Sequence, residues 1–315
     1  MSHTQPPAGV LPLTLRDRVA VWRELLDQCG RKPLRKRVHA LRVVTLRIQA
    51  ELEHELAELP SASHQAQAML RFGKLADKLR QVLGPVRELD VWIGKLQKLR
   101  TSLGNTTEYV PRSTRECIRQ MERLEDRLRK KRRSAAEKLI AQIAKRRGDL
   151  VQVSDEVDQL ARDRLHTADT DIVETILKQF ADVASRFSAF DEENLHDFRK
   201  QIKKVRYLAE IHQDADPICG RIATQVKKVQ SAIGEWHDWQ VLARTAKHGR
   251  YARQVELGEL LDSLAGETLE AAIATCHSIK ARILDLHAGP PSNGVEGKPP
   301  LRSGLLPSTS LRRLA

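Results

Sequence analysis

The chain has 315 residues, of which 41% are apolar and only 4% aromatic. This composition is typical of packed helices, and the length allows about two domains or one domain built from two similar halves. The 54 basic and 41 acidic residues give a net charge of +13, which favours polyanions as partners, although a helical protein with a solvated basic surface would have the same composition.

The cysteines and the apolar segments exclude several classes of protein. Cys29, Cys117, Cys219 and Cys276 are far apart and form no CxxC pair, so the sequence predicts neither a zinc knuckle nor a disulfide framework but buried thiols. No stretch approaches the roughly 18 apolar residues that a membrane span requires, and the N-terminal residues do not resemble a signal peptide. We therefore expect a cytoplasmic protein, and no motif indicates a cofactor.

Helices are predicted in two sets along the chain. After a flexible leader of residues 1–12, the first set comprises helices over about 13–29, 33–59, 63–83, 85–102 and 112–148, with an expected break at Gly84 and Pro85. The second set begins near residue 168 and continues over about 193–213, 217–233, 235–248 and 251–287. We expect one domain over 13–287, with halves over about 13–148 and 168–287, and a disordered tail over 288–315.

Two pairs of segments repeat in the same order in the two halves. VHALRVVTLRIQA from residue 38 and LHDFRKQIKKVRY from residue 195 each place an arginine three positions after a histidine. LGPVRELDV at 83–91 matches IGEWHDWQV at 233–241, which aligns Gly84 with Gly234. We interpret the repeats as the internal duplication of a four-helix unit.

The repeated segments gather cations on one side of a helix. Five basic side chains of the second segment share nearly half of the helix circumference with His196, opposite an apolar stripe. In the first segment, Leu46 and Gln49 stand where the second has Lys203 and Arg206, so we expect the first half to be the weaker binder.

The signs of the charges favour a bound anion over a solvated surface. Seven basic and no acidic residues lie from Arg31 to Arg47, and five and none from Arg199 to Arg206. Such runs repel themselves unless an anion binds, whereas solvated helices usually mix signs. The candidate polyanion-binding residues are Arg35, His39, Arg42, Arg47, Arg71, Lys74, Lys78, His196, Arg199, Lys200, Lys203, Lys204, Arg206, Arg221, Lys227 and Lys228.

The four repeated motifs together resemble the CHAD family, the conserved-histidine α-helical domain, over about residues 13–287. The resemblance implies an all-α fold of two four-helix bundles related by a pseudo-twofold axis. It also implies non-enzymatic binding of inorganic polyphosphate through a basic central channel, and association with polyphosphate granules. The positions that match the family's histidine and basic residues are His39, Arg42, Arg47, His196, Arg199, Lys203, Lys204 and Arg206.

Other functions fit parts of the sequence. The same cations would hold a nucleic acid or another polyanion, and the segment 112–148, with 14 basic and 5 acidic residues, would suit a helical scaffold for partner proteins. A metal site is disfavoured because no histidine or carboxylate follows His39 or His196 at the fourth position, and Trp236 and Trp239 are expected in the core. No phosphate-binding glycine loop, activated nucleophile or ligating carboxylate set is present, so we expect no catalytic activity.

Overall fold

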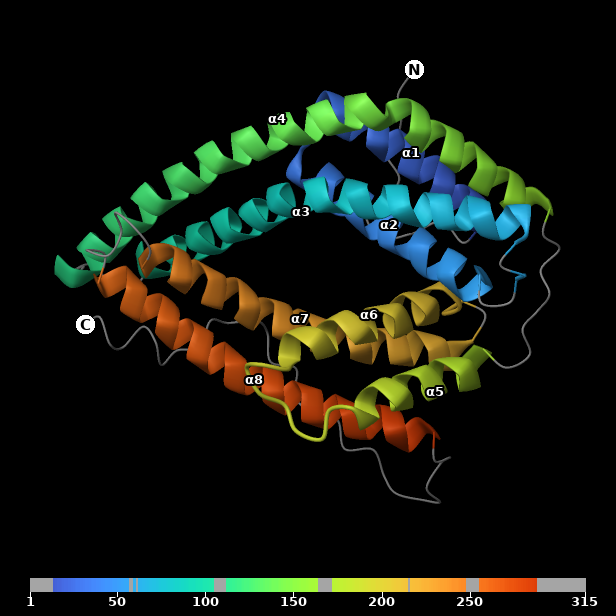
Figure 1. Ribbon diagram of the computed structural model, residues 1–315. Coiled ribbons are helices and arrows are strands. Elements are labelled where there is room, and N and C mark those ends of the chain that lie inside the picture. The colour runs from blue at the N-terminus through green and yellow to red at the C-terminus, as the bar shows by residue number, and fades with distance from the viewer. Residues whose placement is uncertain are drawn as a thin grey trace. The chain divides into compact units, whose positions relative to one another are not determined.

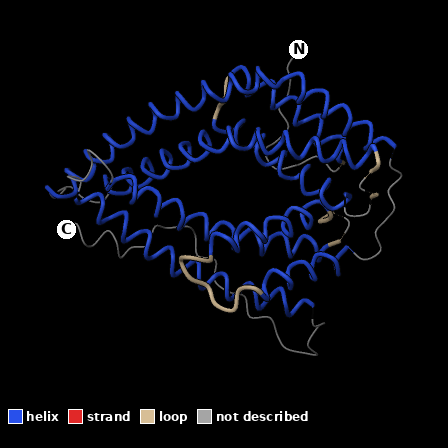
Figure 2. The backbone as a smooth tube through the Cα atoms, viewed as in Figure 1, coloured by secondary structure: helices blue, strands red, loops and turns tan. Residues whose placement is uncertain are grey.

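The computed structural model describes residues 14–56, 59–60, 62–104, 112–163, 172–214, 216–247 and 255–287. In these ranges the chain forms eight α-helices and no strand (Figures 1 and 2), which confirms the all-α prediction. The predicted leader and C-terminal tail lie outside the described residues. The helices are α1 (Leu15–Arg31), α2 (Arg35–Leu56), α3 (His64–Gly104), α4 (Arg112–Asp163), α5 (Ile172–Ser185), α6 (Leu195–Ile211), α7 (Pro217–Lys247) and α8 (Val255–His287).

The chain divides into two compact units, and the division runs through two of its helices. The first unit comprises residues 1–90 and 131–170, and the second comprises residues 91–130 and 171–315. Helix α3 therefore belongs to the first unit up to Asp90, and helix α4 belongs to it from Lys131 onward. The sequence had assigned all of 13–148 to one half, whereas the compact units divide that range between them.

The core of the first unit is built from α1, α2 and the parts of α3 and α4 that belong to it. Trp22 is fully buried, with its ring centroid 5.7 Å from that of Phe72. The indole Nε1–H donates to the Thr45 hydroxyl at 2.9 Å, which satisfies the polar end of the ring. Leu41 and Ile48 from the apolar stripe of α2 are also fully buried and join the same cluster. This stripe fixes which side of α2 remains for the charged residues.

The core of the second unit is formed by α5, α6, α7 and α8. Helix α7 packs against both α6 and α8 (Figure 1). Phe187, Phe190 and Phe198 form an aromatic cluster with ring centroids 4.7 to 6.3 Å apart, at the start of α6. Because Phe198 is adjacent to Arg199 on the helix, the cluster fixes the rotation of α6 and thereby the direction of its charged face.

The predicted breaks at Gly84 and Gly234 are wrong, because α3 and α7 each continue through the glycine. In α3, Pro85 lies inside the helix, where its missing N–H and the ring clash cost about 3 kcal/mol. Leu83 and Val86 are both fully buried, so packing on either side of the proline offsets that cost. A glycine inside a helix costs about 1 kcal/mol relative to alanine, a cost that the buried residues around each glycine offset.

Helix α4 is longer than predicted, since it continues from the expected end at residue 148 to Asp163. Its additional part carries Leu150, Val153, Val157 and Leu160 at helical spacing, and all four are buried in the core of the first unit. The sequence prediction stopped at Gly148, which is exposed and costs only about 1 kcal/mol inside a helix. Tertiary packing therefore decides where α4 ends.

Replacing Trp22 with alanine is expected to lower the free energy of unfolding by about 3–5 kcal/mol, because the change leaves a cavity and removes the hydrogen bond from the indole to the Thr45 hydroxyl. Val255→Ala, at a side chain that is 57% exposed, is the matched control and should change it by less than about 0.5 kcal/mol. Urea unfolding followed by circular dichroism measures both. Equal effects of the two changes would contradict this assignment of the core.

Candidate functional site

In the second unit, Arg199 of α6 lies directly over Gly234 of α7. Its Nε donates to the carbonyl oxygen of Gln230 at 3.3 Å, one helical turn before the glycine. A Cβ placed on Gly234 would lie 3.5 Å from Nη2 of the same guanidinium, so a larger side chain would occupy the place of the arginine. Burial lowers the pKa of Arg199, and the nearby Asp238 carboxylate opposes that effect.

The first unit repeats this contact with different residues. Arg42 of α2 donates through Nη1 to the carbonyl oxygen of Arg80 on α3, at 3.4 Å. A Cβ on Gly84 would lie 3.8 Å from the same Nη1, and Gly84 again stands one turn after the accepting carbonyl. The two glycines that the sequence aligned therefore have the same structural role in the two units, since a guanidinium packs against the helix backbone at each of them.

A guanidinium and a glutamine amide meet beside this contact in both units, but with their helices exchanged. In the second unit, Arg206 of α6 donates through Nη1 to Oε1 of Gln230 on α7, at 2.8 Å. In the first unit, Arg80 of α3 donates through Nη1 to Oε1 of Gln49 on α2, at 3.2 Å. Gln49 occupies the position at which the second segment has Arg206, and it faces an arginine from the neighbouring helix. Sequence reasoning selected Lys74 and Lys78 on α3 but missed Arg80, because periodicity within one helix does not show which residues face each other across two helices.

Both of these arginines also have a carboxylate partner. Nε of Arg206 donates to Glu210 at 2.7 Å, and Nη1 of Arg80 donates to Asp77 at 3.0 Å. A cation that already pairs with a carboxylate gains less from a further anion than one that does not. These two arginines therefore hold neighbouring helices together, and they contribute less positive potential than their number suggests.

The motif histidines each meet the residue that stands three positions after the glycine. In the first unit, Nε of Arg87 donates to Nδ1 of His39 at 3.3 Å. In the second unit, the ring of His196 lies 5.3 Å from that of His237, centroid to centroid, at an angle of 38°. Sequence alignment of the two glycine motifs pairs Arg87 with His237, but it did not indicate that either residue touches a motif histidine.

The pKa values of His196 and His237 both lie below the ordinary range of histidine. Burial is the largest cause that lowers the pKa of His196 and of His237, because it disfavours the charged ring. Asp197 alone opposes the shift, at His196. The neighbouring groups that lower the two pKa values further are Lys200, Arg199 and Lys203 around His196, and His196, Arg199 and Arg244 around His237. Both rings are therefore uncharged near pH 7, in a strongly cationic neighbourhood.

The remaining candidates of the second unit lie on α6 and α7. Lys200 is exposed and pairs with Asp197 at 3.3 Å, while Lys203 is half-buried and Lys204 exposed. On α7, Lys227 lies about 20° around the helix from Gly234, on the side that faces Arg199. Arg221 and Lys228 are also exposed, but they lie about 140° and 120° away from Gly234 and do not belong to the same face.

The candidates of the first unit are more widely scattered. Arg71 points to α4, where it donates to Glu156 at 2.8 Å, so it does not join the group around Arg42. Arg47 is buried on α2 rather than displayed on its surface. Besides Arg71, the exposed candidates of this unit are Arg35 and His39 on α2 and Lys74 and Lys78 on α3.

Lys95 is a further basic residue near the second group, and sequence reasoning did not select it. It stands on α3, pairs with Glu235 of α7, and places its ammonium 4.3 Å from the centroid of the Trp239 ring. Burial lowers its pKa, and Glu235 opposes that effect. Trp236 and Trp239 are both buried, as predicted. Lys95 thereby fixes α7 one turn beyond Gly234.

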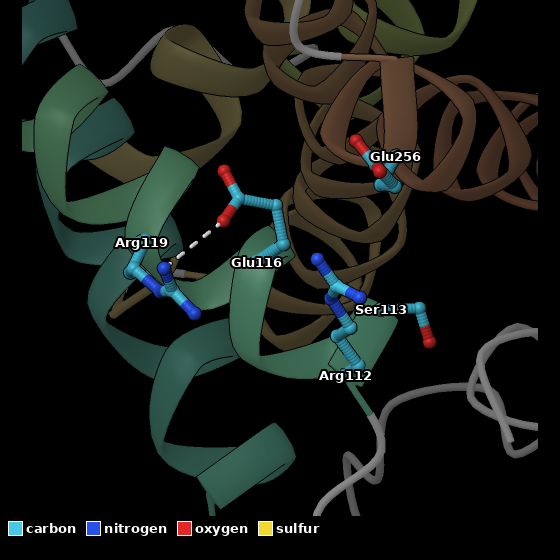
Figure 3. A pocket seen from close by; sticks show the side chains of 5 residues that line it. All are labelled: Arg112, Ser113, Glu116, Arg119 and Glu256. Carbon is cyan, nitrogen blue, oxygen red and sulfur yellow. Dashed lines mark ion pairs between the residues drawn. The ribbon is translucent and has the colours of Figure 1, made fainter.

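A hollow of about 400 Å³ lies elsewhere in the second unit (Figure 3). Its charges balance, because Arg119 pairs with Glu116 at 3.4 Å and Glu256 accepts from Gln120 at 2.8 Å. None of the candidate residues lines it. Its lining residues are Arg112, Ser113, Glu116, Arg119 and Glu256.

Cysteines and acidic residues add no reactive centre to the described ranges. All four cysteines are buried and unlinked, as predicted. Burial raises the pKa of Cys29, Cys117 and Cys276 to about 12 and that of Cys219 to about 11, so the thiols stay protonated near neutral pH. The described part of the chain contains no cluster of three His, Cys, Asp or Glu side chains suited to a metal ion. Nor does it contain a helix long and apolar enough to cross a membrane.

Gly234→Ala and Gly234→Leu should separate backbone propensity from the arginine contact. A Cβ at this position makes only ordinary contact with Arg199, so Gly234→Ala is expected to raise the free energy of unfolding by up to about 1 kcal/mol. Gly234→Leu needs the space of the guanidinium and should lower that energy by about 1–3 kcal/mol. Denaturant unfolding measures both. A leucine variant as stable as the alanine variant would contradict the packing of Arg199 over Gly234.

Comparison with known proteins bears on the resemblance that the four motifs suggested. No curated protein matches this chain. The family model described as CHAD domain matches residues 13–247, which include α1 to α7, both glycines and both motif histidines. This match covers well over half of the chain, so the chain belongs to the CHAD domain family.

Proposed function

We propose that this protein binds inorganic polyphosphate through the cations that lie beside the two arginine–glycine contacts, on α2 and α3 in the first unit and on α6 and α7 in the second. Arg221 and Lys228 of α7 lie away from that face and are not part of the proposed surface. The observation that carries the proposal is the repeated contact in which an arginine lies over a glycine backbone beside a histidine, in a chain that belongs to the CHAD domain family. The family resemblance indicates polyphosphate as the ligand, and the repeated contact explains why the cations stay close together.

The physical chemistry of polyphosphate suits such a surface. The polymer carries about one charge per phosphate and offers no base to read, so rows of Arg and Lys are sufficient to hold it. The contact of Arg199 with the Gln230 carbonyl uses one of the five N–H donors of its guanidinium. That contact orients the group in advance, which lowers the entropy cost of binding an anion.

A nucleic acid is the second candidate ligand, because the same cations would hold its phosphates. Binding of single strands usually adds stacking of bases on exposed aromatic rings. The large apolar side chains that are exposed in the described ranges are Leu34, Leu70 and Val255, and none of them is aromatic. This observation favours polyphosphate over a single-stranded nucleic acid, and a scaffold for partner proteins remains the third alternative.

The repeated contacts also support the internal duplication inferred from the sequence. Two aligned glycines, two arginines and two histidines make corresponding contacts in the two units. We therefore propose that the chain arose from two copies of one helical unit, each a four-helix bundle, as the resemblance implies. Absence of catalytic activity and attachment to polyphosphate granules are part of the same proposal, and the central channel that the resemblance implies stays a prediction.

A competition titration tests the proposed ligand. Labelled long-chain polyphosphate is displaced from the full chain by double-stranded DNA, RNA or pyrophosphate at about 0.15 M salt, where weak surface electrostatics are screened. We expect the Kd of polyphosphate to be at least about tenfold lower than that of either nucleic acid, a difference of about 1.4 kcal/mol. Equal competition by DNA or RNA would indicate a general polyanion binder, and equal competition by pyrophosphate a site for a small anion.

A further inference from the structure

The position three residues after each glycine carries different chemistry in the two units. In the first unit it is Arg87, which donates to His39 at 3.3 Å, and in the second it is His237, whose ring lies 5.3 Å from that of His196. One position therefore holds a permanent cation in the first unit and a titratable group in the second.

We propose that Arg87 and His237 are further polyanion-contacting residues, and that their difference makes the second unit respond to pH while the first keeps its charge. This inference rests on the proposed binding of polyphosphate and names two residues that the motifs did not select. It also predicts which of the two units loses affinity when the pH rises.

In the first unit, the geometry holds the charge on the arginine. The bond from Arg87 uses the lone pair of Nδ1 on His39. That bond needs an unprotonated Nδ1, so the arginine carries the positive charge of the pair whenever the bond is made. Arg42 and the exposed Arg35 and Lys36 on the same helix add positive charge, and Glu88 lies near Gly84 and Arg42. Most of the charge that this unit offers is thus independent of pH near neutrality.

In the second unit, two imidazoles replace that pair. Nδ1 of His196 is buried and accepts or donates no hydrogen bond among the described residues. Burial is the largest cause that lowers the pKa of each ring, and the cations nearest to the rings lower it further. The charged groups in this region are of both signs. Around His196 they are Lys200, Arg199, Lys203 and Asp197, and around His237 they are Arg199 and Arg244. Asp238 acts on Arg199, Glu192 pairs with Arg244, and the Lys95–Glu235 pair lies on the same part of α7.

The sign of the pH effect follows from the lowered pKa of both rings. In the absence of a ligand they are neutral at pH 7, and the folded protein loses stability as the pH falls below 6.5 and through their lowered pKa. A bound polyanion offsets the positive field and favours the imidazolium form. Binding therefore takes up protons, and affinity rises as the pH falls.

Reciprocal substitutions test the inference by the dependence of Kd on pH. Polyphosphate binding to the full chain is measured at pH 6 and pH 8, since each linked proton changes Kd by about tenfold per pH unit. We divide the Kd at pH 8 by the Kd at pH 6. His237→Arg should reduce this Kd ratio at least about threefold relative to the unsubstituted chain. Arg87→His should raise that ratio at least about threefold.

Arg221→His is the matched control, because it introduces a histidine on the exposed surface of α7 away from Gly234. It should leave the Kd ratio within about twofold of that of the unsubstituted chain. Calorimetry in two buffers of different ionisation enthalpy counts the protons taken up, and His237→Asn, which should lose proton uptake, replaces His237→Arg if that variant does not fold. Unchanged ratios in both reciprocal variants, or an equal increase in the control, would overturn the inference. Absence of binding at any pH would instead overturn the proposed function and the inference together.

Discussion

The arrangement of charge in this protein depends on one packing constraint, the contact of an arginine guanidinium with the backbone of a neighbouring helix. Arg42 and Arg199 each donate to a carbonyl oxygen, one turn before a glycine at which a side chain larger than alanine would occupy the place of the guanidinium. A guanidinium held there cannot retreat into bulk water without losing packing and a hydrogen bond. The positive charge is consequently retained at a helix crossing, where self-repulsion would otherwise drive the cations apart.

Around this contact the two units preserve geometry more closely than residue identity. The arginine that meets a glutamine amide stands on α6 in one unit and on α3 in the other, as Arg206 and Arg80. The residue beside the motif histidine is Arg87 in one and His237 in the other. Where the arginine and the glutamine exchange helices, both the contact and its charge are kept. Where an arginine is replaced by a histidine, the contact is kept but its charge changes. The two units therefore share a framework and differ in electrostatics.

The sequence predicted the features that depend on periodicity and on aligned motifs. Apolar spacing gave the all-helical fold and the buried stripe of α2, and alignment of the motifs paired Gly84 with Gly234 correctly as members of one kind of contact. Local turn chemistry failed at Gly84, Pro85 and Gly234, because buried side chains on both sides hold each helix together. Arg80, Arg87 and Lys95 were missed because their partners lie on other helices, which a helical wheel of one segment does not include.

The central claim is that polyphosphate binding depends on cations placed by this contact rather than on net charge. The most direct measurement compares the polyphosphate Kd of two double variants with the same loss of charge, Arg199→Glu with Lys203→Glu on α6, and Arg221→Glu with Lys228→Glu on the far side of α7. Thermal melting checks that both are folded. The account predicts that the first pair weakens binding by more than about tenfold and the second by less than about threefold. Equal losses would contradict it and attribute binding to diffuse charge.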